Sequence, residues 1–494
     1  MRRHPRTLIV AVTAIALLAA ACGGGSGDDG SADSGGNGTE LPKCPVDAFK
    51  KAPGKTEVVL WEGAYVGRTS AALKAIADAY NASQDKVTVR IEKQGASYDE
   101  LRRNYEQAMN GKQLPAIVAG EDTWTQFMID NGTALPAQSC INADKDPRAK
   151  IADLLPSVKA AYSVDGVQWP AAFAVSTVVL YYNKTAFAKA GLDPNKPPTT
   201  LAEVKEAATK LKAAGLGASG PLVMKMDPWY LEHLVTGAGQ TVVNNDNGRN
   251  GKRATATTFD EPAMGEAMGF LSSMKEEGLL NPVANSKLID HYLAVATEAS
   301  DMLFETSTAI TLIAGVVQGG LDLKKELGDS VNISIPANFK VPFEVGVASY
   351  PGIKEAGKGQ VGGSAWYITT TGSAAVQSAA WDFIKYFNQV DNQVKWTAEG
   401  SYLPVRDEAQ QQLEADPAWA GSLIGQWITT AYNGMKTLDA KFPGPLIGPY
   451  DEFRDDLGQA MESVTLQGTD PKAALKTAGS EIDAALKKYN DTNF

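Results

Sequence analysis

Residues 57–122 read EVVLWEGAYVGRTSAALKAIADAYNASQDKVTVRIEKQGASYDELRRNYEQAMNGKQLPAIVAGED, and this stretch decides the fold. Three short apolar runs in it predict strands, at 58–61, 87–91 and 116–118. Between the runs, apolar residues recur three and four apart. This spacing predicts one helix with Leu73, Ile76 and Tyr80 on its buried face, and a second helix carrying Leu101 and Met109. Strands that alternate with amphipathic helices form parallel sheets with right-handed crossovers.

The carboxyl ends of these strands are the expected place for a ligand, because open α/β sheets bind ligands beyond the carboxyl ends of their strands. The residues at these ends are Trp61 with Glu62, Tyr98, and Glu121 with Asp122. Ser97 and Glu100 have the spacing of a capping box, which places Tyr98 at the start of its helix.

A second α/β region follows. Residues 178–182 (VVLYY) predict a buried strand, and Thr200 with Glu203 forms another capping box that opens a helix running to Ala214. Residues 244–253 (NNDNGRNGKR) predict a polar loop tip. A chain of 494 residues is long enough for two such domains.

The N-terminus has the features of an export signal. Arg2, Arg3 and Arg6 precede the apolar run from Leu8 to Ala21, which is too short for a membrane span. Residues 1–21 are therefore predicted to be a cleaved signal peptide.

The next residues predict a lipid anchor. Residues 19–22 (AAAC) resemble the lipobox of bacterial lipoproteins, which implies that Cys22 carries the lipid and holds the exported protein at the outer face of the cytoplasmic membrane. Residues 23–38 (GGGSGDDGSADSGGNG) have almost nothing to bury and predict a flexible tether within residues 22–55. The alternative is an ordinary cleaved signal in which Cys22 has no special role.

With Cys22 lipidated, Cys44 and Cys140 remain as an even pair in an oxidising compartment. We predict that these two cysteines form a disulfide. Two unpaired buried thiols are the alternative.

Composition excludes some functions. Lys and Arg total 46 against 57 Asp and Glu, for a net charge of -11, which argues against nucleic acid as a partner. Beyond the signal peptide the only histidines are His233 and His291, and no metal-hydrolase or serine-hydrolase motif is present, so neither a metal nor a cofactor is predicted. An enzyme alternative stays open, in which Glu62, Glu121 or Asp122 acts in a glycan hydrolase or lyase. An adhesion or scaffold lipoprotein is a third possibility.

Several motifs together resemble a known family. They are YNASQ (80–84), GASYDE (95–100), LPAI (114–117), STVVLYYNK (176–184), GGSAW (362–366), GSYLP (400–404) and YDEFR (450–454). These motifs resemble the extracellular solute-binding proteins of bacterial ABC importers, family 1, the carbohydrate type, and look closest to its glycerol-3-phosphate-binding branch.

The resemblance implies a two-lobed α/β fold of the periplasmic-binding-protein type. Each lobe is expected to contain a mostly parallel sheet flanked by helices, and a hinge is expected to join the lobes. Lobe one is placed at 56–174 and 362–414, and lobe two at 175–361 and 415–494.

The resemblance also implies a function. The protein would be a monomer that encloses a sugar, glycerol-3-phosphate, a glycerophosphodiester or a similar polyol and delivers it to the ABC permease subunits in the membrane. The ligand-contact positions that match the family are Tyr98, Glu121, Ser176, Trp229, Ser307, Gly363, Tyr402 and Arg454.

Residue chemistry agrees with a hydroxyl-rich ligand. Tyr and Trp offer flat apolar faces with one polar tip, and carboxylates accept hydrogen bonds from hydroxyl groups. Arg454 matches the arginine that meets the ligand's phosphate in this family. An ordinary ion pair with Asp455 or Asp456 is the alternative for this arginine.

Overall fold

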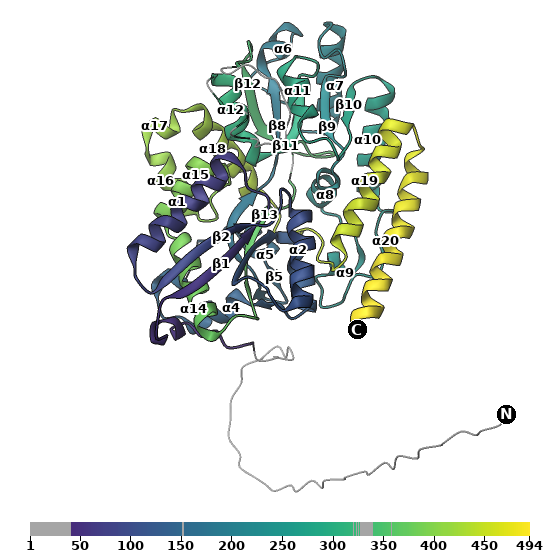
Figure 1. Cartoon of the computed structure of the whole chain (residues 1–494). Coiled ribbons are helices and arrows are strands. Elements are labelled where there is room, and N and C mark those ends of the chain that lie inside the picture. The colour runs from purple at the N-terminus through teal and green to yellow at the C-terminus, as the bar shows by residue number, and fades with distance from the viewer. Residues whose placement is uncertain are drawn as a thin grey trace, which may run out of the picture. The chain divides into compact units, whose positions relative to one another are not determined.

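Two mixed sheets, each flanked by helices, organise the protein (Figure 1). This is a computed structural model, which describes residues 41–494 except 151–152, 320, 323, 325, 327–338 and 357. The predicted signal peptide, Cys22 and most of the predicted tether lie outside the described residues and stay predictions. Within the described part of the chain, no helix is long and apolar enough to cross a membrane.

The first sheet has the strand order β2-β1-β3-β13-β4, and β7 also pairs with β13. Its strands are β1 (Thr56–Glu62), β2 (Val87–Lys93), β3 (Ile117–Glu121), β4 (Ala134–Leu135), β7 (Ala171–Ser176) and β13 (Gly362–Thr369). β1 lies parallel to both β2 and β3. Only β13 runs against its neighbours β3, β4 and β7. The predicted parallel sheet is confirmed, with one reversed strand that enters from far along the chain.

The second sheet repeats this plan with the order β10-β9-β11-β8-β12. Its strands are β8 (Val178–Asn183), β9 (Leu222–Lys225), β10 (Leu280–Val283), β11 (Met302–Thr306) and β12 (Val345–Ser349). β9 is parallel to β10 and β11, whereas β8 is antiparallel to β11 and β12. A separate small hairpin joins β5 (Ser163–Val164) to β6 (Val167–Gln168).

Helices cover the faces of both sheets. Those in contact with the first sheet include α1 (Gly67–Ser83), α2 (Tyr98–Gly111) and α14 (Ala374–Phe387). Those in contact with the second sheet include α6 (Lys184–Lys189), α10 (Pro262–Glu276), α11 (Asp290–Ala296), α18 (Leu423–Lys436) and α19 (Tyr450–Gln467). α19 packs along α20 (Pro471–Asn493), and the two lie side by side in yellow in Figure 1.

The remaining helices are α3 (Thr125–Asp130), α4 (Ala137–Ala143), α5 (Pro156–Ala161), α7 (Leu201–Ala213), α8 (Pro228–Gly237), α9 (Asn244–Gly248), α12 (Ile310–Gln318), α15 (Val390–Gly400), α16 (Asp407–Ala415) and α17 (Pro417–Ala420). Short 3-10 turns lie at η1 (Ala48–Lys51), η2 (Asp122–Trp124), η3 (Pro147–Ala149) and η4 (Ser307–Ala309).

The predicted helix starts are confirmed by their caps. The Ser97 hydroxyl accepts a hydrogen bond from the Glu100 N–H at 3.2 Å and begins α2. The Thr200 hydroxyl accepts from the Glu203 N–H at 3.2 Å and begins α7, which ends one residue before the predicted Ala214. These bonds satisfy N–H groups that the first turn of a helix leaves free.

The end of the predicted tether is folded, which corrects the expected boundary at residue 55. Cys44 and Cys140 form the predicted disulfide, with their Cα atoms 4.9 Å apart. Phe49 of η1 is buried, and the Ser378 hydroxyl of α14 donates to the Val46 carbonyl at 2.7 Å. Residues 44–49 therefore pack onto the first sheet's helices, where the disulfide, the buried Phe49 ring and the hydrogen bond from Ser378 hold them.

The segment 244–253, predicted to be a polar loop tip, forms long-range hydrogen bonds through its two arginines. Arg249 of this segment is half-buried and donates to the carbonyl groups of Ala161, Ser163 and Gly444. Arg253 donates through both terminal nitrogens to the carboxylate of Asp130, the last residue of α3. The segment is therefore anchored by its two arginines to the first sheet's side of the molecule, while Asp246, Asn250 and Lys252 remain exposed.

Candidate functional site

The ends of strands from both sheets border one pocket. Its cavity volume is about 270 Å³. β3 contributes Glu121 and β7 contributes Ser176 from the first sheet, and β9 contributes Lys225 and β11 contributes Thr306 from the second. Gly363, at the start of the reversed strand β13, lies at the same edge. The carboxyl ends of parallel strands from two sheets therefore meet at this site, which we call the cleft pocket.

Aromatic side chains form much of its wall. Tyr98 and Tyr402 line it from the first sheet's side, and Trp229, Tyr230 and Tyr292 line it from the second. Trp229 is the second residue of α8, whose N-cap is Asp227. Such rings offer flat apolar faces, and their N–H and O–H groups supply polar tips.

The tyrosine hydroxyls on the first sheet's side form a network. The Tyr98 hydroxyl is hydrogen-bonded to the Ser364 hydroxyl and lies 3.2 Å from the Tyr402 hydroxyl. The Tyr402 ring stacks on Trp396, with centroids 5.5 Å apart and planes 8° from parallel. Burial raises the pKa of Tyr402 to about 12 and raises the pKa of Tyr98 well above its usual value. Both phenols stay neutral, so each can donate and accept a hydrogen bond.

Arg454 of α19 joins the two sides of the cleft pocket. One terminal nitrogen lies 3.1 and 3.3 Å from the two carboxylate oxygens of Glu121. The other lies 3.3 Å from each carboxylate oxygen of Asp227. Burial raises the pKa of Glu121 and works against the charge of Asp227, but the Arg454 guanidinium opposes this and holds the pKa of Asp227 below its usual value.

One acidic and one basic side chain of the cleft pocket have no ion-pair partner among the described residues. Among the described residues, no side chain donates a hydrogen bond to the Asp122 carboxylate, and no carboxylate pairs with the Lys225 ammonium. Burial, together with the negative charge of Glu121, raises the pKa of Asp122 well above its usual value. Lys225 helps to lower the pKa of Asp227 by its charge alone.

A buried pair lies at the end of β11. His291 Nε2 is 2.8 Å from a carboxylate oxygen of Glu305, and both side chains line the cleft pocket. The other oxygen of Glu305 accepts a hydrogen bond from the N–H of Thr306. His291 Nδ1 is buried and has no hydrogen-bond partner among the described residues.

The structure brings eight of the predicted site residues together. Those that line the cleft pocket are Tyr98, Glu121, Asp122, Ser176, Trp229, Gly363, Tyr402 and Arg454. Their contact with a ligand stays a prediction.

The other three lie outside the cleft pocket. The indole N–H of Trp61 donates to Glu92 on β2 at 2.7 Å. Glu62 is buried at the end of β1, where its carboxylate accepts from the Tyr65 N–H at 3.1 Å. The Ser307 hydroxyl accepts from the Thr177 N–H at 3.3 Å, while its neighbours Thr306 and Thr308 reach the pocket.

Sequence reasoning missed most of the second sheet's contribution. Lys225 ends β9 and Asp227 follows it, and Glu305 and Thr306 end β11. The rule that pointed to Glu121 after β3 applies equally to these strand ends, so the same signal would have found them.

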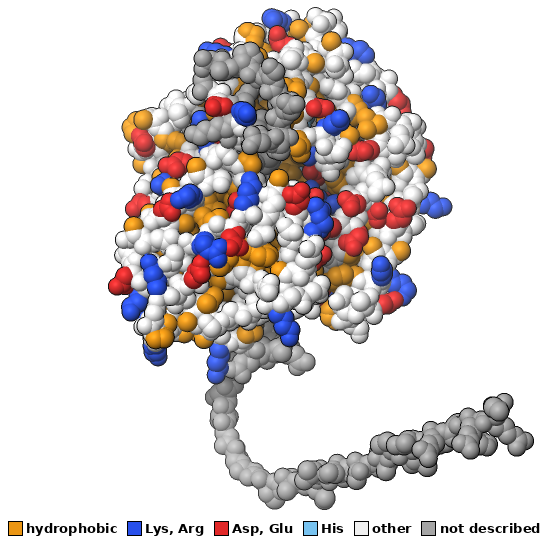
Figure 2. Space-filling model, in the orientation of Figure 1, with side chains coloured by type: hydrophobic (Ala, Val, Ile, Leu, Met, Phe, Trp, Pro, Cys, Tyr) orange, Lys and Arg blue, Asp and Glu red, His pale blue; other side chains and the backbone are white. Residues whose placement is uncertain are grey.

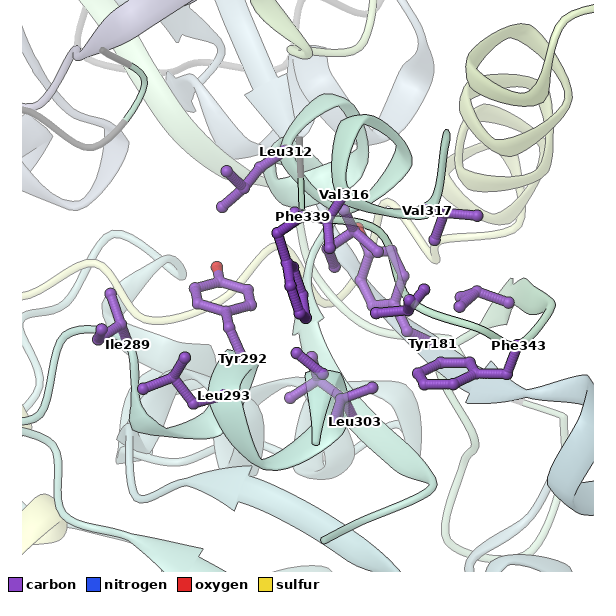
Figure 3. Close-up of a pocket in the computed structure, with 15 residues that line it drawn as sticks. Tyr181, Ile289, Tyr292, Leu293, Leu303, Leu312, Val316, Val317, Phe339 and Phe343 are labelled. Carbon is purple, nitrogen blue, oxygen red and sulfur yellow. The ribbon is translucent and has the colours of Figure 1, made fainter. Parts of the chain in front are cut away.

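A second pocket lies beside the second sheet and is apolar. Its volume is about 80 Å³, and Figure 3 shows side chains of α11 and α12 facing one another across it. Leu303, Val316 and Phe339 are among its lining residues, and Tyr292 belongs to both pockets. With almost no polar group in its wall, it does not offer the hydrogen bonds that a hydroxyl-rich ligand needs.

A buried acid lies behind the cleft pocket. The Tyr450 hydroxyl donates to one carboxylate oxygen of Glu232 at 2.8 Å, and the Gln360 amide donates to the other at 3.2 Å. Burial raises the pKa of Glu232 to about 7. The neighbouring His233 is also buried, which lowers its pKa to about 3.

Neither metal ligands nor a single-sign surface mark another site. Within the described ranges, His, Cys, Asp and Glu form no group of three suited to a metal ion. Acidic and basic side chains are mixed over the face shown in Figure 2.

Comparison with known proteins gives a family. The sequence model of the family described as bacterial extracellular solute-binding protein matches residues 75–421. The sn-glycerol-3-phosphate-binding periplasmic protein UgpB of Yersinia pestis bv. Antiqua (strain Antiqua) is 25% identical over 447 residues, covering 89% of this chain and 94% of that protein. UgpB of Brucella abortus (strain 2308) is 26% identical over 453 residues, covering 87% and 93%.

Solved structures agree on the fold. UgpB from Mycobacterium tuberculosis in complex with glycerophosphocholine superposes with a TM-score of 0.69 at 18% identity, covering 88% of this chain and 100% of that one. The GacH receptor of Streptomyces glaucescens, solved unliganded and with acarbose, gives 0.67 at 20% identity, covering 88% and 99%. The predicted two-lobed fold of the periplasmic-binding-protein type is confirmed.

Proposed function

Because this chain belongs to the bacterial extracellular solute-binding protein family, we propose that it is the receptor of an ABC importer. It encloses a sugar, glycerol-3-phosphate, a glycerophosphodiester or a similar polyol in the cleft pocket and delivers it to the permease subunits. The names of the UgpB relatives, which bind sn-glycerol-3-phosphate, support this range of ligands.

One observation carries the proposal. Aromatic faces and polar groups from both sheets border the same pocket, with Tyr98 and Tyr402 on one side and Trp229 and Tyr292 on the other. A hydroxyl-rich ligand placed there contacts both sheets at once. Its apolar C–H surfaces pack on the rings, and its hydroxyls bond to the polar groups.

Such a ligand would favour a closed arrangement of two lobes. We place lobe one at 56–174 and 362–414 and lobe two at 175–361 and 415–494, with the hinge where the chain passes between β7 and β8 and enters β13. A ligand that contacts both lobes stabilises the closed state by its differential affinity for that state.

The protein would work outside the cytoplasmic membrane. Family membership supports export, and the proposed lipid on Cys22 would hold the monomeric receptor near its permease through the remaining tether. A single acyl chain anchors only marginally, so multiple acylation is part of this proposal.

The glycan-hydrolase alternative gains no support at the cleft pocket. It would use a pair of carboxyl groups facing one bond of the substrate. Glu62 lies outside the pocket, and Glu121 is paired with Arg454. Asp122 is free in the pocket, but the other carboxylates of the lining stand in ion pairs, so it has no second free carboxyl group to work with among the described residues. We therefore propose no catalytic residue.

A thermal-shift screen tests the receptor function. The full exported chain carrying Cys22→Ser is melted with monosaccharides, oligosaccharides, glycerol-3-phosphate and glycerophosphocholine. A ligand at a thousandfold excess over its Kd stabilises the folded state by about 4 kcal/mol, which raises the melting temperature by several degrees.

Two variants make the screen specific. Trp229→Ala, in the cleft pocket, should abolish the shift, whereas Trp61→Phe, outside it, should keep the shift. If no solute shifts the melting temperature, the result favours an adhesion or scaffold lipoprotein. Release of product from oligosaccharides that stops in Glu121→Gln would instead establish the hydrolase.

A further inference from the structure

The charges in the cleft pocket do not match those of a phosphate ester. Four carboxyl groups share its lining with two cationic side chains. The acids are Glu121, Asp122, Asp227 and Glu305, and the bases are Lys225 and Arg454. A phosphate monoester carries close to two negative charges at neutral pH, so the three carboxylates that stand in ion pairs, Glu121, Asp227 and Glu305, would repel it.

Arg454, the arginine expected to meet a phosphate, is already engaged. Each of its terminal nitrogens faces both oxygens of one carboxylate, Glu121 on one side and Asp227 on the other. A phosphate bound in the usual two-pronged way needs these same N–H groups. It would have to displace at least one carboxylate, which would then lie partly buried without a partner.

This double ion pair also connects the two sheets. Glu121 ends β3 of the first sheet, Asp227 follows β9 of the second, and Arg454 comes from α19, which packs on the second sheet. Arg454 and its carboxylates therefore hold the two sides of the cleft pocket together without any ligand.

Asp122 and Lys225 are left to bind the ligand. They are the acidic and the basic side chain of the pocket that have no ion-pair partner among the described residues. One accepts hydrogen bonds and the other donates them, and a hydroxyl group can do both. Neutral hydroxyls satisfy both side chains and leave the other ion pairs intact.

We propose that the cleft pocket selects an uncharged polyhydroxylated solute over a phosphate ester, that Asp122 and Lys225 bind its hydroxyls, and that Arg454 clamps the two sheets. This inference rests on the proposed receptor function and narrows its ligand class.

Isothermal titration with matched probes tests the selection. Maltose, trehalose and glucose are compared with glucose 6-phosphate, glycerol-3-phosphate and glycerophosphocholine, on the full exported chain carrying Cys22→Ser. We expect a neutral sugar to bind at least about a hundredfold more tightly than any phosphate ester. The Kd of the neutral sugar should change less than about twofold between low and high salt, because the sugar forms no ion pair with the protein.

Tighter binding of a phosphate ester, with an affinity that falls steeply as salt is added, overturns the inference but is consistent with the proposed receptor function. No binding of any probe removes the receptor function itself.

Variants test the roles of the three charged residues. Asp122→Asn and Lys225→Met should each weaken the neutral sugar about tenfold or more, the usual effect of losing a hydrogen bond to a charged group. Arg454→Gln should also weaken the neutral sugar, mainly through faster dissociation. The double variant Arg454→Gln with Glu121→Gln should bind the sugar no more weakly than Arg454→Gln alone, because the two residues act as one clamp.

Controls separate the clamp from misfolding and from a phosphate contact. Arg90→Gln removes an exposed arginine that pairs with Glu57 and Glu92, and should leave Kd unchanged. If Arg454→Gln is poorly folded by circular dichroism, Arg454→Lys takes its place in the double-variant comparison. An Arg454 variant that binds neutral sugar normally and loses only phosphate esters contradicts the clamp.

Discussion

At the scale of single residues, Glu232 is a buried acid whose pKa lies near neutral pH. Its pKa is raised to about 7 from 4.5 by burial, although the Tyr450 hydroxyl and Gln360 amide oppose the shift. Between these two pH values the folded protein holds this proton while the unfolded chain has released it. The free energy of unfolding therefore falls as the pH rises through this interval.

Glu232→Gln should remove that slope. The variant should be more stable than the parent at pH 8, by on the order of 3 kcal/mol, and equal to it below pH 4.5. Gln360 can reverse its amide to accept from the new side chain, because its own oxygen has no partner among the described residues. Urea unfolding between pH 4 and 8 measures the difference. His233 is present in both proteins, so its effect on the difference cancels. If the free energies of unfolding of the two proteins change in parallel with pH, Glu232 is not the group responsible for the slope.

The positions of the strand ends located part of the cleft pocket's first-sheet side, and the family resemblance located Ser176, Gly363 and Tyr402. Glu121 and Tyr98 were predicted from their places beyond strand ends, and both line the pocket. Trp61 and Ser307 do not line the pocket. Successive side chains along a strand point to opposite faces of the sheet, so a shift of one residue moves a side chain from one face to the other. The pairing of Glu121 with Arg454, 333 positions apart, depends on how the two sheets pack and has no local signal.

At the scale of elements, the reversed strand β13 organises the first sheet. It pairs with β3, β4 and β7, and its first residues pass close to the β7 backbone. Gly363 has a φ of +120°, and a Cβ at this position would lie 2.2 Å from the Ala174 carbonyl oxygen. Only glycine adopts this backbone conformation without strain at such a close approach.

Gly363→Ala should therefore destabilise the protein by roughly 2–4 kcal/mol, through strain and the collision with β7. Gly265→Ala is the matched control, because Gly265 lies inside α10 with no heavy atom within 4 Å of an added Cβ. That change should be neutral or stabilising by about 0.5–1 kcal/mol, since alanine favours helix. Denaturant unfolding of the two variants measures both changes in stability. Equal midpoints for Gly363→Ala and Gly265→Ala would contradict the predicted strain at position 363.

Local patterns predicted elements well where the chain folds locally. The apolar runs became β1, β2, β3 and β8, and the capping boxes became the starts of α2 and α7. The reversed direction of β13 and β8 was not visible, because strand direction follows from long-range pairing. The segment 244–253 was misread for a related reason, since its arginines bond to carbonyl and carboxylate groups that are distant in sequence.

At the scale of the whole molecule, a second polar contact joins the sides of the two sheets. The Asp130 carboxylate, at the end of α3, is fully buried and accepts from Arg253 and from Tyr489 of α20 at 2.9 Å. None of these residues lines the cleft pocket. The contact stabilises the arrangement of the two sheets in this structure.

Asp130→Asn should weaken ligand binding about tenfold to a hundredfold without touching the ligand, because a buried ion pair that loses one partner costs several kcal/mol. Stopped-flow measurement should place the change mainly in faster dissociation. Asp144→Asn is the control, because Asp144 pairs with Lys385 within the first sheet's helices. Asp144→Asn should lower the melting temperature and leave the Kd for the ligand unchanged. An unchanged Kd in Asp130→Asn would show that this contact does not influence closure.

The stack of Tyr402 on Trp396 has a practical consequence. Tyr402 lines the cleft pocket, and its ring lies almost parallel to an indole that is itself fully buried. A solute bound as proposed would press on Tyr402, change the electronic surroundings of Trp396 and contact Trp229 directly. The protein thus contains its own optical reporter, and its natural ultraviolet emission can follow occupancy in real time with no dye attached.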